Sequence, residues 1–176
     1  MSNYRRARDP GALYFFTLVT HLRKPVLTQP AVRHSLREAI VRTRERFPFD
    51  IHGWVLLPDH LHCIWQLPPD DHDFGRRWSI IKRHVSQQCG DAPSPSTSRG
   101  ARREYDFWQR RFWEHRIRDE RDHRQHMDYL HWNPVRHGLV DRVADWPWSN
   151  FHRLVCEGVY PADWGGVGEI DGKFGE

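Results

Sequence analysis

The sequence predicts an α+β domain of the split βαβ, ferredoxin-like type, with an antiparallel sheet of four to five strands and helices on one face. Two observations predict this fold. Segments rich in β-branched and aromatic residues alternate with segments whose apolar residues recur at helical spacing. Their order is strand, helix, strand, strand, helix, strand, followed by one more helix and a C-terminal extension. We expect one domain over 1–156 and an acidic tail over 157–176.

Each element has its own signal. Residues 13–20 are aromatic and β-branched, which predicts a buried strand. Helical spacing from Val32 predicts a helix that ends at Pro48, and strands at 51–57 and 60–67 form a hairpin through the Pro58-Asp59 turn. Later elements are expected as follows: a helix at 74–89, a basic Pro- and Ser-rich loop at 91–103, a strand at 112–117, and a helix from Asp119 to Asn133-Pro134.

Composition narrows the class of protein. The chain is 38% hydrophobic and 28% charged, which is typical of a globular domain. No apolar run approaches the ~20 residues that span a bilayer, and the N-terminus lacks the apolar core of a signal peptide. The three cysteines form no CxxC pair. We therefore expect a cytoplasmic protein with reduced thiols and no membrane partner.

Charge points to a polyanion as the partner. Only three of the 27 basic residues are lysines, and arginine has the planar fork that matches phosphates and guanine edges. A codon bias towards arginine explains this count equally well. The charge is also unevenly placed, because residues 157–176 hold five acids against one lysine. A basic body with an acidic tail is typical of a nucleic-acid binder whose tail competes for the groove.

The strongest local signal is Pro58-Asp59-His60-Leu61-His62. Side chains alternate along a strand, so His60 and His62 project from the same face and can converge on one cation. Two ordinary polar histidines, in a chain that has 13, are the competing interpretation. On the last helix, Tyr129 and Asn133 are four residues apart and share a face, so Asn133 can add an oxygen ligand. A tyrosine packed on the sheet is the alternative for Tyr129.

Several motifs together resemble one family. His60-Leu61-His62 has the form found in HUH endonucleases, and the segment from Tyr129 to Val140 resembles the tyrosine segment of REP-associated tyrosine transposases. Other stretches are similar to that family in the same order: Tyr4-Arg5-Arg6, Phe15-Phe16-Thr17, 54–58, 111–115 and 145–149. The resemblance extends to Trp164, with 91–103 as an apparent insertion.

The resemblance implies an enzyme that cuts and rejoins single-stranded DNA beside a palindromic hairpin. Tyr129 would be the nucleophile that forms a 5′-phosphotyrosine, and His60, His62 and Asn133 would hold Mg²⁺ or Mn²⁺. Gln125 and His126, one turn before the tyrosine, are rival ligands. A hairpin-binding protein that no longer cuts is the alternative function. An RNA phosphodiesterase that uses two histidines as acid and base would want a His-x-Ser/Thr pair repeated on two strands, and no second such pair stands out.

Contacts with DNA and the oligomeric state are further expectations. The alternation of aromatic residues and arginines over 107–113 suits base stacking and phosphate binding, although aromatic residues of a strand can equally be core. We expect these side chains to contact DNA: Arg5, Arg6, Arg8, Arg102, Arg103, Trp108, Arg110 and Arg111. Asn133-Pro134 and Gly138 would let the last helix fold back on its own chain, which favours a monomer over a helix-exchanged dimer.

Overall fold

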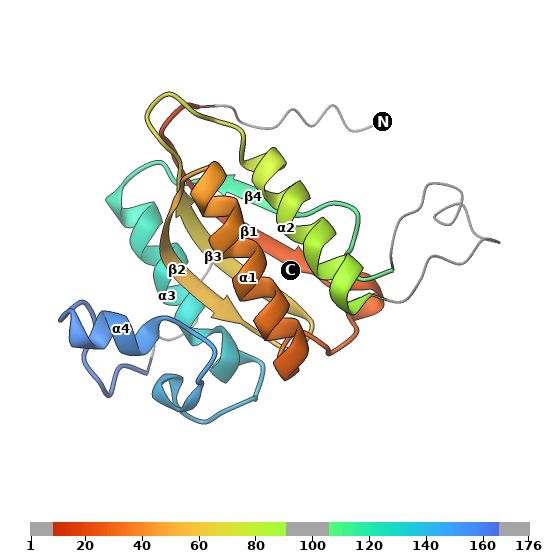
Figure 1. The fold of residues 1–176 in the computed structure, drawn as a ribbon. Coiled ribbons are helices and arrows are strands. Elements are labelled where there is room, and N and C mark those ends of the chain that lie inside the picture. The colour runs from red at the N-terminus through yellow and green to blue at the C-terminus, as the bar shows by residue number, and fades with distance from the viewer. Residues whose placement is uncertain (1–8, 91–105, 166–176) are drawn as a thin grey trace, which may run out of the picture.

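The computed structural model describes residues 9–90 and 106–165, and within these ranges one sheet of four strands forms the centre of the fold (Figure 1). The strand order is β2-β3-β1-β4 and each neighbouring pair is antiparallel. The strands are β1 (Leu13–Val19), β2 (Asp50–Leu56), β3 (His60–Gln66) and β4 (Trp113–Arg116). Because β3 lies between β1 and β2, the predicted split βαβ arrangement is confirmed.

Helices cover both faces of this sheet. Helices α1 (Pro30–Arg46) and α2 (Phe74–Cys89) lie side by side on one face, as predicted. The additional helix, α3 (Glu120–Arg136), packs on the opposite face (Figure 1). The alternation of side chains along β1 explains the two layers, because Phe16 packs in the core beneath α1 and α2 while Phe15 packs in the core beneath α3.

Helix α3 extends further than the sequence predicted. It continues through Pro134, which lies inside the helix, and ends at Arg136. Proline removes one helical donor, and Pro134 is buried within the helix that it interrupts. Gly138 has a φ of 65°, a left-handed conformation that glycine adopts without strain, and it terminates the helix. The extra turn brings Arg136 and His137 to the end of α3.

The segment after α3 closes the edge of the sheet. Two short helices, η3 (Val143–Asp145) and α4 (Phe151–Cys156), flank a stretch that runs along β2. The backbone N–H of Leu56 donates to the carbonyl of Trp148 (2.8 Å), and that of Trp54 donates to the Asn150 side chain (2.7 Å). These bonds cover backbone groups of β2 that would otherwise be open to another strand.

The predicted boundary at 156/157 does not mark the end of the packed domain. Tyr160 packs against Phe151, and its hydroxyl donates to Asp128 (2.8 Å). The first part of the predicted tail therefore belongs to the core beneath α3, and 166–176 lie outside the described residues. Within the described ranges, every helix is too short or too polar to cross a membrane.

Candidate active site

His60 and His62 lie together on the α3 face of the sheet. Their ring centroids are 4.9 Å apart, and the two side chains are 2% and 0% exposed. Leu61, between them, points into the core beneath α1 and α2. The predicted alternation is thus observed, and it places two imidazoles where they can bind the same group.

The Nδ1 atom of each of these rings already has a hydrogen-bond partner. In His62 it lies 2.9 Å from the Thr17 hydroxyl, on the neighbouring strand β1. In His60 it lies 2.6 Å from an Asp59 carboxylate oxygen. Although burial opposes it, the hydrogen bonds from His60 and Arg23 hold the pKa of Asp59 at about 2. With Nδ1 occupied, Nε2 is the ring atom through which each histidine would bind a cation.

Tyr129 of the same chain reaches this pair from α3. Its ring centroid lies 5.3 Å from that of His62, and its hydroxyl accepts a hydrogen bond from the Arg136 guanidinium (3.0 Å). The tyrosine side chain is only 2% exposed. Asn133, one turn further along α3, is fully buried. The candidate nucleophile and the candidate ligands therefore come from β3 and α3 of one chain.

Two further residues join the site without having been predicted. Arg136 contacts Tyr129 through its hydrogen bond and also lies over the tyrosine ring, 5.5 Å from the centroid. His137, an exposed residue at the C-terminal end of α3, has its ring 5.2 Å from that of His60. The four-residue spacing of Tyr129, Asn133 and His137 is a sequence signal that could have found the histidine.

The rival ligands do not join the histidine pair. Gln125 is exposed on α3. His126 is buried but packs beside His115 and Asp122. The phenyl ring of Phe15 lies 5.3 Å from the ring of His62 and 4.9 Å from that of His126, so it separates the two groups.

The predicted DNA-contacting residues fall into three groups. Trp108 is only 5% exposed and packs in the core, which favours a structural role over base stacking for this residue. Arg110 and Arg111 are exposed in the segment before β4. The rest of the set lies outside the described residues: Arg5, Arg6, Arg8, Arg102 and Arg103.

The donor set fits a divalent cation. Two imidazoles and the side-chain oxygen of a buried asparagine can occupy three positions and leave others for a phosphate and water. The carboxylate behind His60 is the outer partner that metal-binding histidines commonly have. These residues therefore suit a metal-assisted reaction at a phosphate, with a phenol beside it.

Known proteins are similar to this chain in sequence and fold. The family described as transposase IS200 like matches residues 11–131, which is more than half of the chain. The chain belongs to the IS200-like transposase family. A REP-associated tyrosine transposase of Escherichia coli K12 is 44% identical over 166 residues, covering 94% of this chain and 92% of that protein. A similarly described protein of Haemophilus influenzae is 44% identical over 168 residues, covering 94% of each chain.

A solved structure agrees with this family assignment. It is a REP-associated tyrosine transposase bound to a REP hairpin, with 43% sequence identity and a TM-score of 0.84. The match covers all of this chain and 98% of that one. The α+β fold is therefore shared with a tyrosine transposase over its whole length.

Proposed function

We propose that this transposase cuts and rejoins single-stranded DNA at the foot of a palindromic hairpin, with Tyr129 as the nucleophile. The observation that carries the proposal is the position of Tyr129, whose ring lies 5.3 Å from that of His62 within one chain. The relatives that are named tyrosine transposases, one of them bound to a REP hairpin, support the same substrate.

The covalent chemistry needs a phenol that can lose its proton. The Tyr129 oxygen attacks the phosphorus, the new oxygen–phosphorus bond forms, and the bond from phosphorus to the 3′ oxygen breaks. The phenol proton passes to solvent water, and the departing 3′ oxygen takes up a proton from solvent. A 3′-hydroxyl can later attack the same phosphorus and release the tyrosine, so no ATP is needed.

The residues around the phenol have separate tasks. Arg136 donates to the Tyr129 oxygen, and its positive charge stabilises the negative charge that develops there. Asp59 and Thr17 hold the rings of His60 and His62 in place. His137, beside His60, is placed to bind a phosphate or to carry a proton.

We also propose that His60, His62 and Asn133 hold Mg²⁺ or Mn²⁺. Such an ion would neutralise charge on the phosphate that is attacked. Oxygen ligands and a phosphate substrate favour these hard ions, whereas two imidazoles also suit later transition metals. The identity of the ion is thus a separate question from its position.

The nucleophile and the proposed ligands all belong to one chain, which favours action as a monomer over a helix-exchanged dimer. The exposed Arg110 and Arg111 remain proposed contacts to the DNA backbone, as do the five arginines outside the described residues. A cytoplasmic, nucleoid-associated location follows from such a substrate.

The experiment is incubation of the full-length protein with an end-labelled hairpin oligonucleotide that carries a single-stranded foot, in the presence of Mn²⁺ or Mg²⁺. A covalent adduct that survives denaturing electrophoresis is the expected result. Tyr129→Phe should form no adduct and bind the hairpin with unchanged affinity. Tyr14→Phe is the matched control, because Tyr14 is buried in the core on the other side of the sheet.

The main competing function has a distinct outcome in the same experiment. Tight binding of the hairpin without any adduct or cleavage, with either metal ion, would indicate a binding protein and refute the nuclease. An adduct that persists in Tyr129→Phe would assign the nucleophile to another residue.

A further inference from the structure

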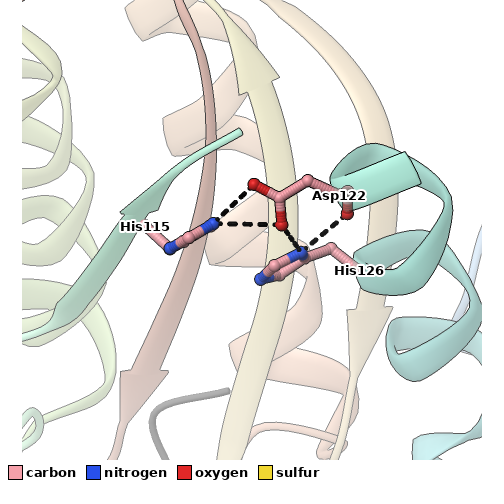
Figure 2. A group of neighbouring side chains, drawn as sticks. All are labelled: His115, Asp122 and His126. Atoms are coloured by element: carbon pink, nitrogen blue, oxygen red, sulfur yellow. Dashed lines mark hydrogen bonds and ion pairs between the residues drawn. The ribbon is translucent and has the colours of Figure 1, made fainter. Parts of the chain in front are cut away.

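A second cluster of potential metal ligands lies on the same face of the sheet. His115 from β4 and Asp122 and His126 from α3 place three ligand atoms within 4.8 Å of one another. Figure 2 shows the Asp122 carboxylate between the two imidazoles. Within residues 9–90 and 106–165, this is the group of three such side chains that meets the geometry of a cation site.

The cluster is separate from the histidine pair of the active site. Phe15 pairs with His115 in the sheet, and its phenyl ring contacts both His62 and His126. An ion bound at one group would therefore not share ligands with an ion bound at the other.

The interatomic distances are close to those of a metal site. The Nε2 atom of His115 lies 2.9 and 3.2 Å from the two carboxylate oxygens of Asp122. The Nδ1 atom of His126 lies 3.1 Å from the Oδ1 atom of the same carboxylate. Ligands bound at about 2.0 to 2.2 Å in a tetrahedral site lie roughly 3.3 to 3.6 Å apart, so each imidazole needs only a small shift relative to the carboxylate.

The surroundings orient the carboxylate. The backbone N–H and the guanidinium of Arg118 both donate to one oxygen of Asp122, at 3.0 and 3.2 Å. Asp122 and His126 are each 7% exposed, whereas His115 is 25% exposed and gives an ion a route in. Burial lowers the pKa of His126, which keeps its imidazole in the neutral form that binds metals.

Metal binding would replace the hydrogen bonds between the His115 Nε2 atom and the Asp122 carboxylate, and the one between His126 and the Asp122 carbonyl. The Nδ1 atom of His126 now lies 2.8 Å from the backbone carbonyl of Asp122 and must donate to it. Loss of this proton would free the nitrogen for a cation. The carbonyl keeps a partner, because in an α-helix it accepts the amide four residues later.

We propose that His115, Asp122 and His126 form a second cation site, selective for Zn²⁺ over Mg²⁺, that fastens α3 to β4. Two nitrogens and one carboxylate oxygen are the donors that zinc takes, with water or substrate in the fourth position. Asp122 lies seven residues before Tyr129, two turns along the same helix. A bound ion would therefore fix the helix that carries the nucleophile.

The test measures zinc binding to the full-length, chelator-stripped protein by calorimetry and by metal analysis after dialysis. His115→Gln is expected to bind one equivalent of Zn²⁺ fewer than wild type. The control variant is His123→Gln, which alters a histidine of α3 outside the cluster and is expected to bind as many equivalents as wild type. In a His60→Ala/His62→Ala background, one equivalent should persist and disappear when His115→Gln is added.

Stability gives a second measurement. In the His60→Ala/His62→Ala background, Zn²⁺ at about a hundred times its Kd should raise the Tm by roughly 5 to 10 °C, and Mg²⁺ should not. Equal zinc stoichiometry in wild type and in folded His115→Gln would overturn the proposal and leave the cluster as a hydrogen-bonded brace. This result is distinguishable from failure of the proposed active site, which concerns the tyrosine adduct alone.

Discussion

Gly53 sets the distance between α3 and the sheet. A Cβ atom added at this position of β2 would lie 2.7 Å from the sulfur of Met127 and 3.1 Å from a methyl carbon of Leu130. Ordinary contacts of such an atom are 3.4 to 4 Å. Gly53→Ala therefore forces Met127 to move and Leu130 to yield, and both residues flank Tyr129 on α3.

The size of the effect follows from these overlaps. Overpacking of a core by one methyl group costs about 1 to 3 kcal/mol in unfolding free energy. Met127→Ala alone leaves a cavity and costs about 2 to 4 kcal/mol. In the double variant Gly53→Ala/Met127→Ala the new methyl group occupies part of that cavity. The loss of unfolding free energy in the double variant should therefore be at least about 1 kcal/mol smaller than the sum of the two single effects.

The assay combines urea unfolding with the hairpin cleavage rate at a fixed, saturating DNA concentration. If Gly53→Ala shifts α3 by a fraction of an ångström, cleavage should fall about 10- to 100-fold, with hairpin affinity unchanged. The double variant should recover part of that rate. Strictly additive changes in the unfolding free energy, or a wild-type cleavage rate in Gly53→Ala, would refute the idea that the contact between Gly53 and α3 positions the proposed nucleophile.

Three other predictions follow from single contacts. Asp59→Asn removes the charge behind His60, so the Mn²⁺ concentration for half-maximal cleavage should rise about 10- to 100-fold; an unchanged requirement would contradict this role. Arg136→Gln should slow cleavage about 10- to 100-fold without weakening DNA binding, as measured by single-turnover rates. Buried Arg77 donates to three backbone carbonyls and to the Asp71 carboxylate, so Arg77→Met should lower the unfolding free energy by about 2 to 4 kcal/mol. The hydrogen bond from Arg77 lowers the pKa of Asp71, so wild type should lose this stability as the pH falls below about 4, and the variant should not.

The sequence predicted the strands and helices well because their periodicity reflects burial. Strand β3 alternates between two cores, so its residues identify both its period and the common face of His60 and His62. The side of the sheet on which α3 packs could not be predicted in this way. An amphipathic helix has the same period on either face. In the fold α1 and α2 cover one face, and on the other face Gly53, which has no side chain, leaves room for Met127 and Leu130.

The site was less predictable where the same residue types serve two purposes. Trp108 lies in a run of aromatic residues and arginines that suits DNA binding, yet the fold buries it in the core. His126 lies within one turn of Tyr129, yet the rotation of α3 directs it to His115 and Asp122. Arg136 and His137 were missed because Pro134 indicated an earlier end to the helix.

The geometry of the proposed active site reduces to the position of one helix on one sheet. The histidine pair is fixed by β3 and its hydrogen bonds to Thr17 and Asp59. The positions of Tyr129 and Asn133 depend on how firmly α3 is held against the sheet. Because the tyrosine is 2% exposed, DNA can reach it only if groups around it move, and these movements must leave α3 in place. The contacts at Gly53 and the hydrogen bonds between α3 and His115 of β4 would hold the helix while the end that carries the proposed nucleophile admits a phosphate.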